Sequence, residues 1–436
     1  MVRKFKDKIK QKKAVVAVIG LGYVGLPLAV EFAKKGFRAI GVDLDKKKTG
    51  SINTGNSYIP DISSAEMRPL VKKGMLHATH DYSKLKEADA IIICVPTPLR
   101  KTKDPDMSFI ISAADAIAKN LRRGQVIVLE STTYPGTTDE VMLPKLEATG
   151  LKNGKDFCLG FSPERIDPGN SRFMTHNIPK VVGGITNICR DNIALLYSQI
   201  VEKVIPVSSV RVAEMVKLLE NTFRSVNIGL VNELALMCDD MKIDVWEVIE
   251  AAKSKPFGFM PFYPGPGLGG HCIPIDPLYL AWKARSQGFE ARFIDLASQI
   301  NADMPMHVAE RTARALNMRF CKALRCSKVL IVGLSYKKNV TDTRESPAYE
   351  VIEKLKERGA SVSYYDPFVP ESEFRGHKMK SIKLTPSELK KYDCAVIVTD
   401  HSDVDYDIIV KNSKFILDTR NALSNIKTDR SKIERL

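Results

Sequence analysis

The sequence lacks the features that mark membrane proteins, secreted proteins and zinc or dithiol proteins. Its longest apolar stretches, such as Ala90 to Val95, are far shorter than the ~18–20 residues of a membrane-spanning helix. The basic N-terminus has no apolar segment of the kind that a secretory signal contains. The eight cysteines include no Cys-x-x-Cys pair, so we predict neither a zinc ribbon nor a redox dithiol, and no metal site. We expect a cytoplasmic protein in which most cysteines are buried thiols.

Positive charge is in excess, but it is spread along the chain. The 66 Lys and Arg residues against 51 Asp and Glu residues give a net charge of +15. Only the N-terminal arm, residues 3–13, is densely basic, and we interpret it as a solvated leader. Because no aromatic-interleaved basic module accompanies it, we predict no nucleic-acid partner. An anionic small-molecule substrate accounts for a basic surface equally well.

The order of the secondary-structure patterns divides the chain into three parts. A length of 436 residues corresponds to about three domains of ~150 residues. Short β-branched runs alternate with helical patterns at both ends of the chain, which indicates parallel sheets built from β-α-β units. The predicted strands are residues 14–19, 38–42, 90–95, 125–129, 157–161, 328–332, 361–365, 395–399 and 415–417. We therefore predict an α/β protein with domains at residues 1–206, 207–319 and 320–436.

The middle of the chain has a different pattern. Residues 208–243 contain no proline and a single glycine. Apolar residues recur there at spacings of three and four, for example at Val212, Leu219, Leu230 and Met237, which is typical of one long amphipathic helix. A helix of this length with so wide an apolar stripe needs a partner, so we expect this domain to join the subunits of a homodimer or higher homo-oligomer.

A glycine loop follows the first predicted strand and opens the first predicted helix. In this loop Gly20 makes the tight turn, Gly22 lets the backbone approach a pyrophosphate, and Gly25 lets the helix pack closely on the strand. Asp43, at the end of the next strand, would accept hydrogen bonds from ribose hydroxyls and repel a 2′-phosphate. We therefore predict that NAD is the cofactor rather than NADP. The other candidate cofactor contacts in this region are Tyr23, Val24 and Lys48.

The most unusual segment is residues 264–277, where four glycines precede Cys272. We reason that packing does not require this glycine density, and we favour a nucleophilic role for Cys272. His271 adjoins it, but neighbouring side chains diverge, so its role as a base stays open. A carboxylate, Asp276, lies four residues on. Lys217 and Asn221 are one turn apart on the predicted long helix, so both could reach one ligand.

Taken together, these residues resemble a known family, the nucleotide-sugar 6-dehydrogenases that act on UDP-glucose and UDP-N-acetylhexosamines. The resemblance runs from about Ala14 to Leu423. The motifs that carry it are Gly20-x-Gly22-x-x-Gly25, Val95-Pro96-Thr97-Pro98, Glu130-Ser131-Thr132, Ser162-Pro163-Glu164-Arg165, Lys217-x-x-x-Asn221, Gly269-Gly270-His271-Cys272 with Asp276, and Lys337-Lys338-x-x-x-Asp342-Thr343-Arg344-Glu345-Ser346. The resemblance implies an N-terminal Rossmann domain, a central helical domain and a C-terminal Rossmann-like domain that binds UDP.

The family's reaction, which the resemblance implies for this chain, is a four-electron oxidation of the sugar C6 alcohol to a carboxylate with two NAD. By similarity, Cys272 captures the C6 aldehyde as a thiohemiacetal, which is oxidised to a thioester and hydrolysed. Lys217 and Asp276 match residues that stabilise oxyanions and handle protons. Glu164 and Thr132 match residues that hold or activate the hydrolytic water.

The remaining matches concern binding rather than bond making. By similarity, Asn221 positions the sugar, Thr97 and Thr132 line the NAD site, and Arg344 contacts the cofactor. Lys337 and Arg420 match positions that bind the diphosphate and the sugar. The full set of substrate-binding candidates is Glu164, Arg165, Lys217, Asn221, Gly269, Lys337 and Arg420.

The forms of two motifs separate branches of the family. The Ser162-Pro163-Glu164-Arg165 and Gly270-His271-Cys272 forms are similar to the N-acetylhexosamine branch, and most similar to enzymes that act on UDP-N-acetylglucosamine and supply surface polysaccharide. UDP-glucose and the galactosamine and mannosamine sugars are the alternative substrates. Two more distant alternatives are a two-electron hydroxyacid dehydrogenase, which would not need Cys272, and a binding protein that senses NAD or a nucleotide sugar without turnover.

Overall fold

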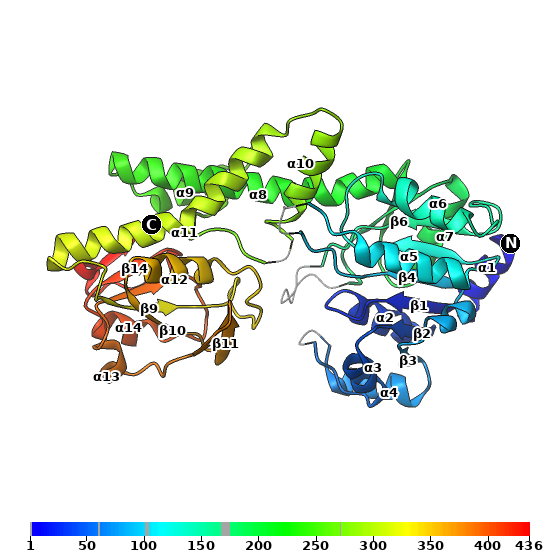
Figure 1. Ribbon diagram of the computed structural model, residues 1–436, viewed down its shortest axis with the longest axis horizontal. Helices are drawn as coiled ribbons and strands as arrows, with labels where there is room; N and C mark the ends of the chain where they lie inside the picture. Colours follow the sequence, from blue (N-terminus) through cyan, green and yellow to red (C-terminus); the bar gives the residue numbers. More distant parts are fainter. Residues whose placement is uncertain (1, 60–61, 101–103, 167–174, 271) are drawn as a thin grey trace. The chain divides into compact units, whose positions relative to one another are not determined.

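The computed structural model describes residues 2–59, 62–100, 104–166, 175–270 and 272–436. The described chain forms two compact units (Figure 1). The first comprises residues 1–220 and 282–288, and the second comprises residues 221–281 and 289–436. The long helix α8 (Val210–Met241) contributes residues to both units.

The first unit is built on an eight-stranded sheet of order β3-β2-β1-β4-β5-β6-β7-β8. All neighbouring strands are parallel except β6 and β7. Successive strands are added on one side of β1 up to β3 and on its other side from β4 onward. This strand order is that of a doubly wound dinucleotide-binding fold and confirms the predicted α/β class. The strands are β1 Val15–Ile19, β2 Arg38–Val42, β3 Leu76–Thr79, β4 Ala90–Ile93, β5 Val126–Leu129, β6 Cys158–Phe161, β7 Lys180–Gly184 and β8 Val204–Pro206.

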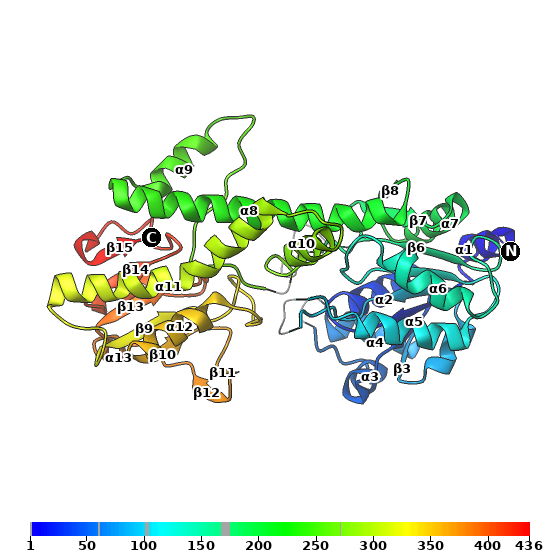
Figure 2. The same ribbon diagram turned by 45° about the horizontal axis from the view of Figure 1, so that its top comes forward.

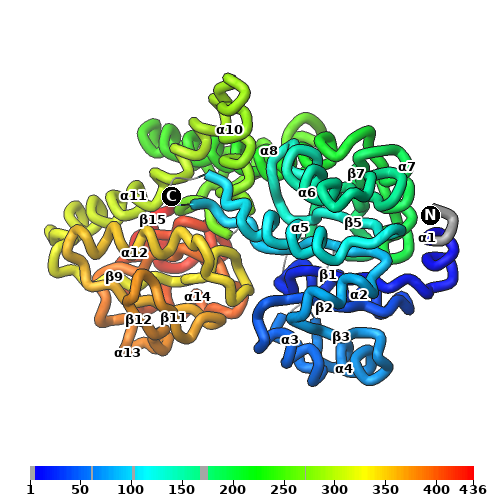
Figure 3. The backbone as a smooth tube through the Cα atoms, turned by 45° about the vertical axis from the view of Figure 1, so that its right-hand side comes forward, coloured from blue at the N-terminus to red at the C-terminus, as the bar shows by residue number. Residues whose placement is uncertain are grey.

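Helices connect these strands and cover the sheet, as Figure 3 shows for α2, α3 and α4 beside β1, β2 and β3. Several begin at a side chain that accepts a hydrogen bond from the first helical turn; Ser63, for example, forms a capping box with Glu66. The helices are α1 Val2–Lys10, α2 Gly25–Lys34, α3 Lys46–Asn53, α4 Ser64–Lys72, η1 Tyr82–Glu87, α5 Ser108–Asn120, η2 Thr137–Met142, α6 Leu143–Glu147 and α7 Asn187–Tyr197.

The N-terminal arm is not the solvated leader that its charge suggested. It forms helix α1, whose Phe5 and Ile9 are buried in the core of the first unit. Lys8 forms an ion pair with Asp89 at 2.7 Å, and Lys12 donates to Gln199 at 2.8 Å. Lys6 and Lys10 are exposed, and the two apolar residues four positions apart anchor the amphipathic helix.

The apolar stripe of α8 is largely exposed on the single chain. Val212, Leu219, Leu230 and Met237 are 41%, 58%, 50% and 49% exposed. The buried side of the helix combines apolar residues, among them Leu218 and Val231, with small or polar residues, which are Ala213, Glu214, Ser225, Asn232 and Ala235. The predicted helix is confirmed within two residues at each end. Its most apolar side remains largely exposed on the single chain, although Phe223 on that side contacts the ring of Phe262.

Three further helices of the second unit accompany α8 (Figure 2). They are α9 Val245–Lys253, α10 Asp276–Ser286, whose last turn belongs to the first unit, and α11 Arg292–Phe320. Within the described residues, no helix is long and apolar enough to cross a membrane.

A second parallel sheet, of order β10-β9-β13-β14-β15, forms the C-terminal domain. Its strands and helices are β9 Lys328–Val332, α12 Pro347–Glu357, β10 Ser361–Tyr365, α13 Pro386–Leu389, β13 Cys394–Ile397, α14 Tyr406–Asn412, β14 Ile416–Asp418, η3 Arg430–Lys432 and β15 Ile433–Arg435. An antiparallel hairpin, β11 Glu371–Phe374 and β12 His377–Lys380, lies outside this sheet.

The first turn of each sheet is built in the same way. Gly20 after β1 and Gly333 after β9 have φ values of 89° and 90°. In each turn the next backbone N–H, that of Leu21 or Leu334, donates to an aspartate that follows the neighbouring strand. This equivalence reveals a structural duplication for which no sequence repeat is apparent.

The cysteines are less uniformly buried than expected. Four are buried, Cys94 is partly buried, and Cys272, Cys321 and Cys326 are exposed. Cys321 and Cys326 both have left-handed backbone conformations, with φ values of 48° and 68°, in the connection between α11 and β9. These two thiols are exceptions to the expected burial of most cysteines, because they lie in an exposed loop.

Candidate active site

The glycine loop after β1 has three differently used glycines. A Cβ on Gly20 would lie 2.4 Å from the carbonyl oxygen of Cys94, and one on Gly25 would lie 1.8 Å from the carbonyl oxygen of Gly20. Both contacts are impossible for a larger residue, so these two glycines serve the turn and the packing of α2. A Cβ on Gly22 would meet no atom within 4 Å. The open space beside Gly22, at the start of a helix, can receive an anionic group.

Asp43 lies beside this loop. It follows β2, and its Oδ2 accepts a hydrogen bond from the backbone N–H of Leu21 at 2.8 Å. Its Oδ1 accepts from the N–H of Asp45 at 2.9 Å, and Lys48 Nζ lies 3.6 Å from Oδ2. The Asp43 side chain is 12% exposed, so its carboxylate is fixed at the loop and still reachable. Tyr23 is exposed, and Val24 precedes α2.

Thr97 and Thr132 follow neighbouring strands at the same edge of the sheet. Thr97 lies in the loop after β4 and is buried, whereas Thr132 lies after β5 and is partly buried. Ser131 Oγ donates to the carbonyl oxygen of Val95 at 2.8 Å and thereby joins the two loops. Because the carboxyl ends of parallel strands meet at one edge, both threonines lie at the edge where such folds bind their ligands.

Glu164 follows β6 and is held by three described donors. Its Oε1 accepts from the backbone N–H groups of Arg165 and Ile166, both at 2.7 Å. Its Oε2 accepts from Lys180 Nζ at 3.0 Å. Burial opposes ionisation, but the charge and hydrogen bond of Lys180 and the Ile166 amide hold the pKa of Glu164 below its ordinary value. Lys217 Nζ donates to the carbonyl oxygen of Glu164 at 2.6 Å.

A second carboxylate lies on the other side of Lys180. Lys180 Nζ is 2.9 Å from an oxygen of Glu130, whose side chain is fully buried and also accepts a hydrogen bond from the Tyr197 hydroxyl. Burial raises the pKa of Glu130 to about 7, with the nearby Glu164 acting in the same direction and Lys180 against it. Burial alone would lower the pKa of Lys180, but the two carboxylates raise it.

Arg165 is engaged within the first unit. Its guanidinium binds the carboxylate of Glu220 on α8, at 2.7 and 3.3 Å, and donates to the carbonyl oxygen of Pro179 at 2.7 Å. These contacts tie the segment after β6 to the long helix. Its predicted contact with substrate stays a prediction.

In the second unit, Cys272 and Asp276 flank the start of α10. Cys272 is exposed, and its carbonyl oxygen accepts from the N–H groups of Ile275 and Asp276 at 3.0 and 2.8 Å. The Asp276 side chain is almost fully buried and accepts a hydrogen bond from the amide of Asn221. The fold therefore brings Asp276 and Asn221 into contact. The sequence could not predict this contact, because the two residues are far apart in the chain. His271 lies outside the described residues.

The surroundings of the glycines before Cys272 show that one prediction was wrong, namely that packing does not require so many glycines in this segment. A Cβ on Gly269 would lie 2.7 Å from Tyr336 Cβ and 2.8 Å from Pro347, and one on Gly270 would lie 2.8 Å from the Tyr336 ring. A Cβ on Gly265 would lie 2.4 Å from the Arg420 guanidinium. Packing does require this glycine density, because the loop lies directly against the C-terminal domain.

The predicted diphosphate-binding residues lie after strands of the second sheet. Lys337 follows β9 in a loop whose Ser335 hydroxyl donates to the Lys337 carbonyl oxygen at 2.8 Å. Arg420 follows β14, and its Nε donates to the carbonyl oxygen of Val398 at 2.9 Å. Arg344 is exposed and forms several hydrogen bonds with Asp342, at 2.7 to 3.1 Å.

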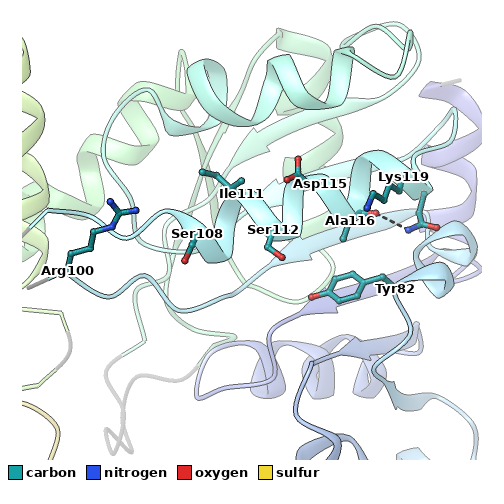
Figure 4. A pocket seen from close by; sticks show the side chains of 9 residues that line it. Tyr82, Arg100, Ser108, Ile111, Ser112, Asp115, Ala116 and Lys119 are labelled. Carbon is teal, nitrogen blue, oxygen red and sulfur yellow. Dashed lines mark hydrogen bonds between the residues drawn. The ribbon is translucent and has the colours of Figure 1, made fainter.

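A pocket of about 720 Å³ lies along α5 (Figure 4). Tyr82, Ser108, Ser112 and Lys119 are among the side chains that line it. None of the residues predicted from the sequence to act on a ligand lines this pocket, and its walls are mostly short or polar side chains.

Sequence reasoning missed two residues of the buried group beside Glu164, which are Lys180, in contact with Glu164, and Tyr197, in contact with Glu130. Lys180 and Tyr197 belong to no recognised motif, and Glu130 was identified within a motif but without a role. A lysine that begins an otherwise apolar strand, Lys180-Val181-Val182, is the one signal that could have indicated a buried cation. Its partners come from strands and a helix distant in sequence, so the pattern could not identify them.

Three family models match the chain in order along its length. The NAD binding domain of the UDP-glucose/GDP-mannose dehydrogenase family matches residues 14–201, its central domain matches residues 211–303, and its UDP binding domain matches residues 330–425.

Individual relatives cover nearly the whole chain. The UDP-N-acetyl-D-glucosamine 6-dehydrogenase of Pseudomonas aeruginosa is 36% identical over 394 residues, covering 90% of this chain and 92% of that protein. The UDP-N-acetyl-D-mannosamine dehydrogenase of Methanococcus vannielii is 35% identical over 431 residues, covering 95% of each. The solved structure of a UDP-D-ManNAc dehydrogenase from Pyrococcus horikoshii is similar with a TM-score of 0.86 at 34% identity, covering 95% of this chain and 96% of that one.

Proposed function

The chain belongs to the UDP-glucose/GDP-mannose dehydrogenase family, and on this basis we propose that it oxidises the C6 alcohol of a UDP-N-acetylhexosamine to a carboxylate. The observation that carries the proposal is the complete domain set, with an NAD-binding domain at one end and a UDP-binding domain at the other. Both halves of the predicted chemistry, a glycine loop and a cysteine with a neighbouring acid, lie in the expected domains.

The geometry of the glycine loop fits NAD. The open space at Gly22 and the fixed carboxylate of Asp43 are the features that a pyrophosphate and a ribose need. NAD, when bound, accepts a hydride from the substrate carbon. We propose that Gly20, Gly22, Gly25 and Asp43 hold it, with the other predicted contacts, which are Tyr23, Val24, Lys48, Thr97, Thr132 and Arg344.

The proposed reaction requires two hydride removals and one hydrolysis. The alcohol loses a hydride and a proton to become an aldehyde, and the sulfur of Cys272 adds to the aldehyde carbon. Loss of a second hydride from this thiohemiacetal gives a thioester, which water converts to the carboxylic acid and the free thiol. Lys217 and Asp276 would offset oxyanion charge and move protons. Asn221 would position the sugar, while Glu164 and Thr132 would hold the water.

The remaining proposed substrate contacts follow from the same comparison. Lys337 and Arg420 would bind the UDP diphosphate and the sugar, and Arg165 and Gly269 would line the sugar. The domain limits proposed for these roles are residues 1–206, 207–319 and 320–436.

We further propose UDP-N-acetylglucosamine as the substrate within this class. The support is the form of the Ser162-to-Arg165 and Gly270-to-Cys272 motifs. Relatives named for the glucosamine and mannosamine sugars are 36% and 35% identical. A panel of UDP-sugars, followed by NADH absorbance, tests the choice: kcat/KM should be highest for UDP-N-acetylglucosamine. A higher value for UDP-N-acetylmannosamine or UDP-glucose would refute it.

The reaction itself is tested through Cys272. The unaltered enzyme should release two NADH per sugar consumed, with no free aldehyde. Cys272→Ala should abolish acid formation and leave NAD binding intact. In Cys272→Ser, an ester should form and hydrolyse slowly, because an alkoxide is a poor leaving group, and intact-mass spectrometry should detect the covalent adduct. If Cys272→Ala still released two NADH per sugar at a near-normal rate, a covalent intermediate would be excluded.

We also propose that the exposed stripe of α8 joins two copies of the chain. Large apolar side chains such as Leu219, Phe223 and Leu230 are 58%, 47% and 50% exposed, and continuous apolar surface of this kind is typical of a subunit interface. Sedimentation analysis of the full chain should give a dimer or larger assembly. Leu219→Glu together with Leu230→Glu should yield monomers, and a monomeric unaltered chain would refute this proposal.

A further inference from the structure

The inference concerns the buried group formed by Lys180, Glu130 and Tyr197 beside Glu164. Lys180 begins β7, Glu130 follows β5, and Tyr197 ends α7, so three separate elements supply them. All three side chains are at least nine-tenths buried. Burying charged groups without partners is costly, and such groups are retained where geometry and pairing compensate.

Lys180 is the centre of the group. Its Nζ lies 2.9 Å from Glu130 and 3.0 Å from Glu164, so one cation is shared by two carboxylates. Glu130 cannot turn toward another partner easily, because the Tyr197 hydroxyl also donates to it. The Lys180 ammonium is therefore fixed from one side and presents its charge to Glu164 from the other.

The Glu164 carboxylate has one acceptor position left for a further hydrogen bond. A carboxylate offers about four acceptor positions. Among the described residues, two backbone amides occupy Oε1 and Lys180 occupies one position on Oε2. The Glu164 side chain is 12% exposed, so a water molecule can reach the remaining position on Oε2. The orientation of that position is set by Lys180.

We propose that Lys180, itself fixed by Glu130 and Tyr197, is a positioning residue that fixes the Glu164 carboxylate in its ionised form, so that its free acceptor position can hold the water used in thioester hydrolysis. This inference rests on the proposed function and deepens it. In the hydrolysis the water oxygen forms a bond to the acyl carbon and the carbon–sulfur bond breaks. One water proton passes to the departing sulfur, and the other is released as the product acid ionises. Lys180 takes part in no bond change.

The charge arrangement gives the proposal a pH dependence. Without Lys180, Glu164 would lie in a buried site near a second carboxylate, and both effects raise a carboxyl pKa. Glu164 would then be protonated at a pH where the unaltered enzyme has it ionised, and a protonated carboxyl accepts a hydrogen bond poorly. The titratable groups around Glu164 are Cys94, Glu130, Lys180, Tyr197 and Lys217.

Lys180→Met is the direct test. Hydride removal does not depend on Lys180, so the variant should release about two NADH per active site in a rapid burst at a near-normal rate. Steady-state turnover should then be about 100-fold slower, within the range that proton-handling groups contribute. An acyl adduct on Cys272 should accumulate and be visible by intact mass. In the profile of kcat against pH, the acid limb should move to higher pH by about one to two units.

Lys180→Met leaves Glu130 buried without a cation and could prevent folding. The variant that avoids this carries both Lys180→Met and Glu130→Gln, because the neutral amide still accepts from Tyr197 and leaves no unpaired charge there. It should show the same burst and adduct, with an acid limb between those of the unaltered enzyme and Lys180→Met. Lys180→Arg should restore turnover to within about tenfold, since an arginine keeps the charge.

Lys145→Met is the matched control, because Lys145 also pairs with a carboxylate in this unit, Asp115 at 2.7 Å, but on the surface. It should leave turnover and the pH profile unchanged. If the double variant is folded and shows neither burst nor adduct, or if kcat falls without a shift of the acid limb, Lys180 has only a structural role. Failure of the unaltered enzyme to give two NADH per sugar would instead reject the proposed function.

Discussion

Gly22 gives the sharpest test of the cofactor site, because its hydrogen faces open space. A Cβ at this position meets no protein atom within 4 Å, and the backbone is not left-handed. Gly22→Ala should therefore change the free energy of unfolding by less than about 1 kcal/mol. The added methyl group would occupy the space that we assign to the NAD pyrophosphate. We expect the Kd for NAD to rise tenfold or more, a loss of about 1.4 kcal/mol.

Thermal unfolding with and without NAD measures both quantities. At a concentration of 100 Kd, NAD should stabilise the unaltered protein by about 2.7 kcal/mol. At the same concentration, a tenfold weaker variant should gain only about 1.4 kcal/mol. With about 2–4 °C per kcal/mol for a domain of this size, the NAD-induced rise in Tm should be about 3–5 °C smaller in Gly22→Ala. Titration calorimetry gives the Kd directly.

Gly25→Ala is the matched control with the opposite outcome. Its Cβ would lie 1.8 Å from the carbonyl oxygen of Gly20, and a backbone atom cannot move aside cheaply. We expect a loss of about 3 kcal/mol in stability, or about 6–12 °C in Tm, even without NAD. The reasoning is refuted if Gly22→Ala binds NAD as tightly as the unaltered protein, or if the two variants are equally stable.

Three further changes test other parts of the structure. Asp43→Asn should weaken NAD binding and reduce discrimination against NADP, measured as the ratio of the two Kd values, and an unchanged ratio would contradict the ribose contact. Burial raises the pKa of Glu214 to about 7, although hydrogen bonds from Gly136 and Thr138 act in the opposite direction. Between pH 4.5 and 7 the folded chain therefore keeps a proton on Glu214 that the unfolded chain releases. Stability should fall by about 3 kcal/mol as pH rises from 4.5 to 7, and Glu214→Gln should flatten this part of a Tm-against-pH curve. Ile9→Ala should cost about 2–5 kcal/mol in a denaturant titration, whereas exposed Lys6→Ala should cost almost nothing.

The strands of the two sheets were predictable because each is a short apolar run with turn residues at its ends. Residues 38–42, 328–332 and 361–365 are strands over the predicted bounds. Strand β3, Leu76–Thr79, was missed because its alternate residues are polar and partly exposed. The pairing of β7 with β6 in the antiparallel sense depends on contacts between segments distant in the chain, which no local pattern records.

Helix α1 shows how charge can mislead. Lysines dominate residues 3–13, but two apolar side chains four residues apart are enough to anchor a helix whose other sides are basic. The apolar stripe of α8 is misleading for a different reason, because it does not face the core of its own chain. Periodicity identifies the helix but not which side faces its own chain, and the buried side here carries Glu214 and Asn232. Buried polar groups of this kind are stabilised by specific partners, such as the backbone amides that donate to Glu214, and partners are not visible in sequence.

The duplicated turn explains how one framework can serve two ligands. In both sheets a left-handed glycine is followed by an N–H that donates to an aspartate, Asp43 or Asp366. Asp43 is 12% exposed, whereas Asp366 is fully buried and also accepts from the N–H of Ser335 and from His401 Nε2. Because Nδ1 of His401 accepts from a backbone amide, Nε2 carries the proton given to Asp366. The second aspartate therefore holds its own loop in place and has no capacity to read a ribose. The same fold element thus presents a reachable carboxylate in one domain and uses a buried carboxylate to shape a loop in the other.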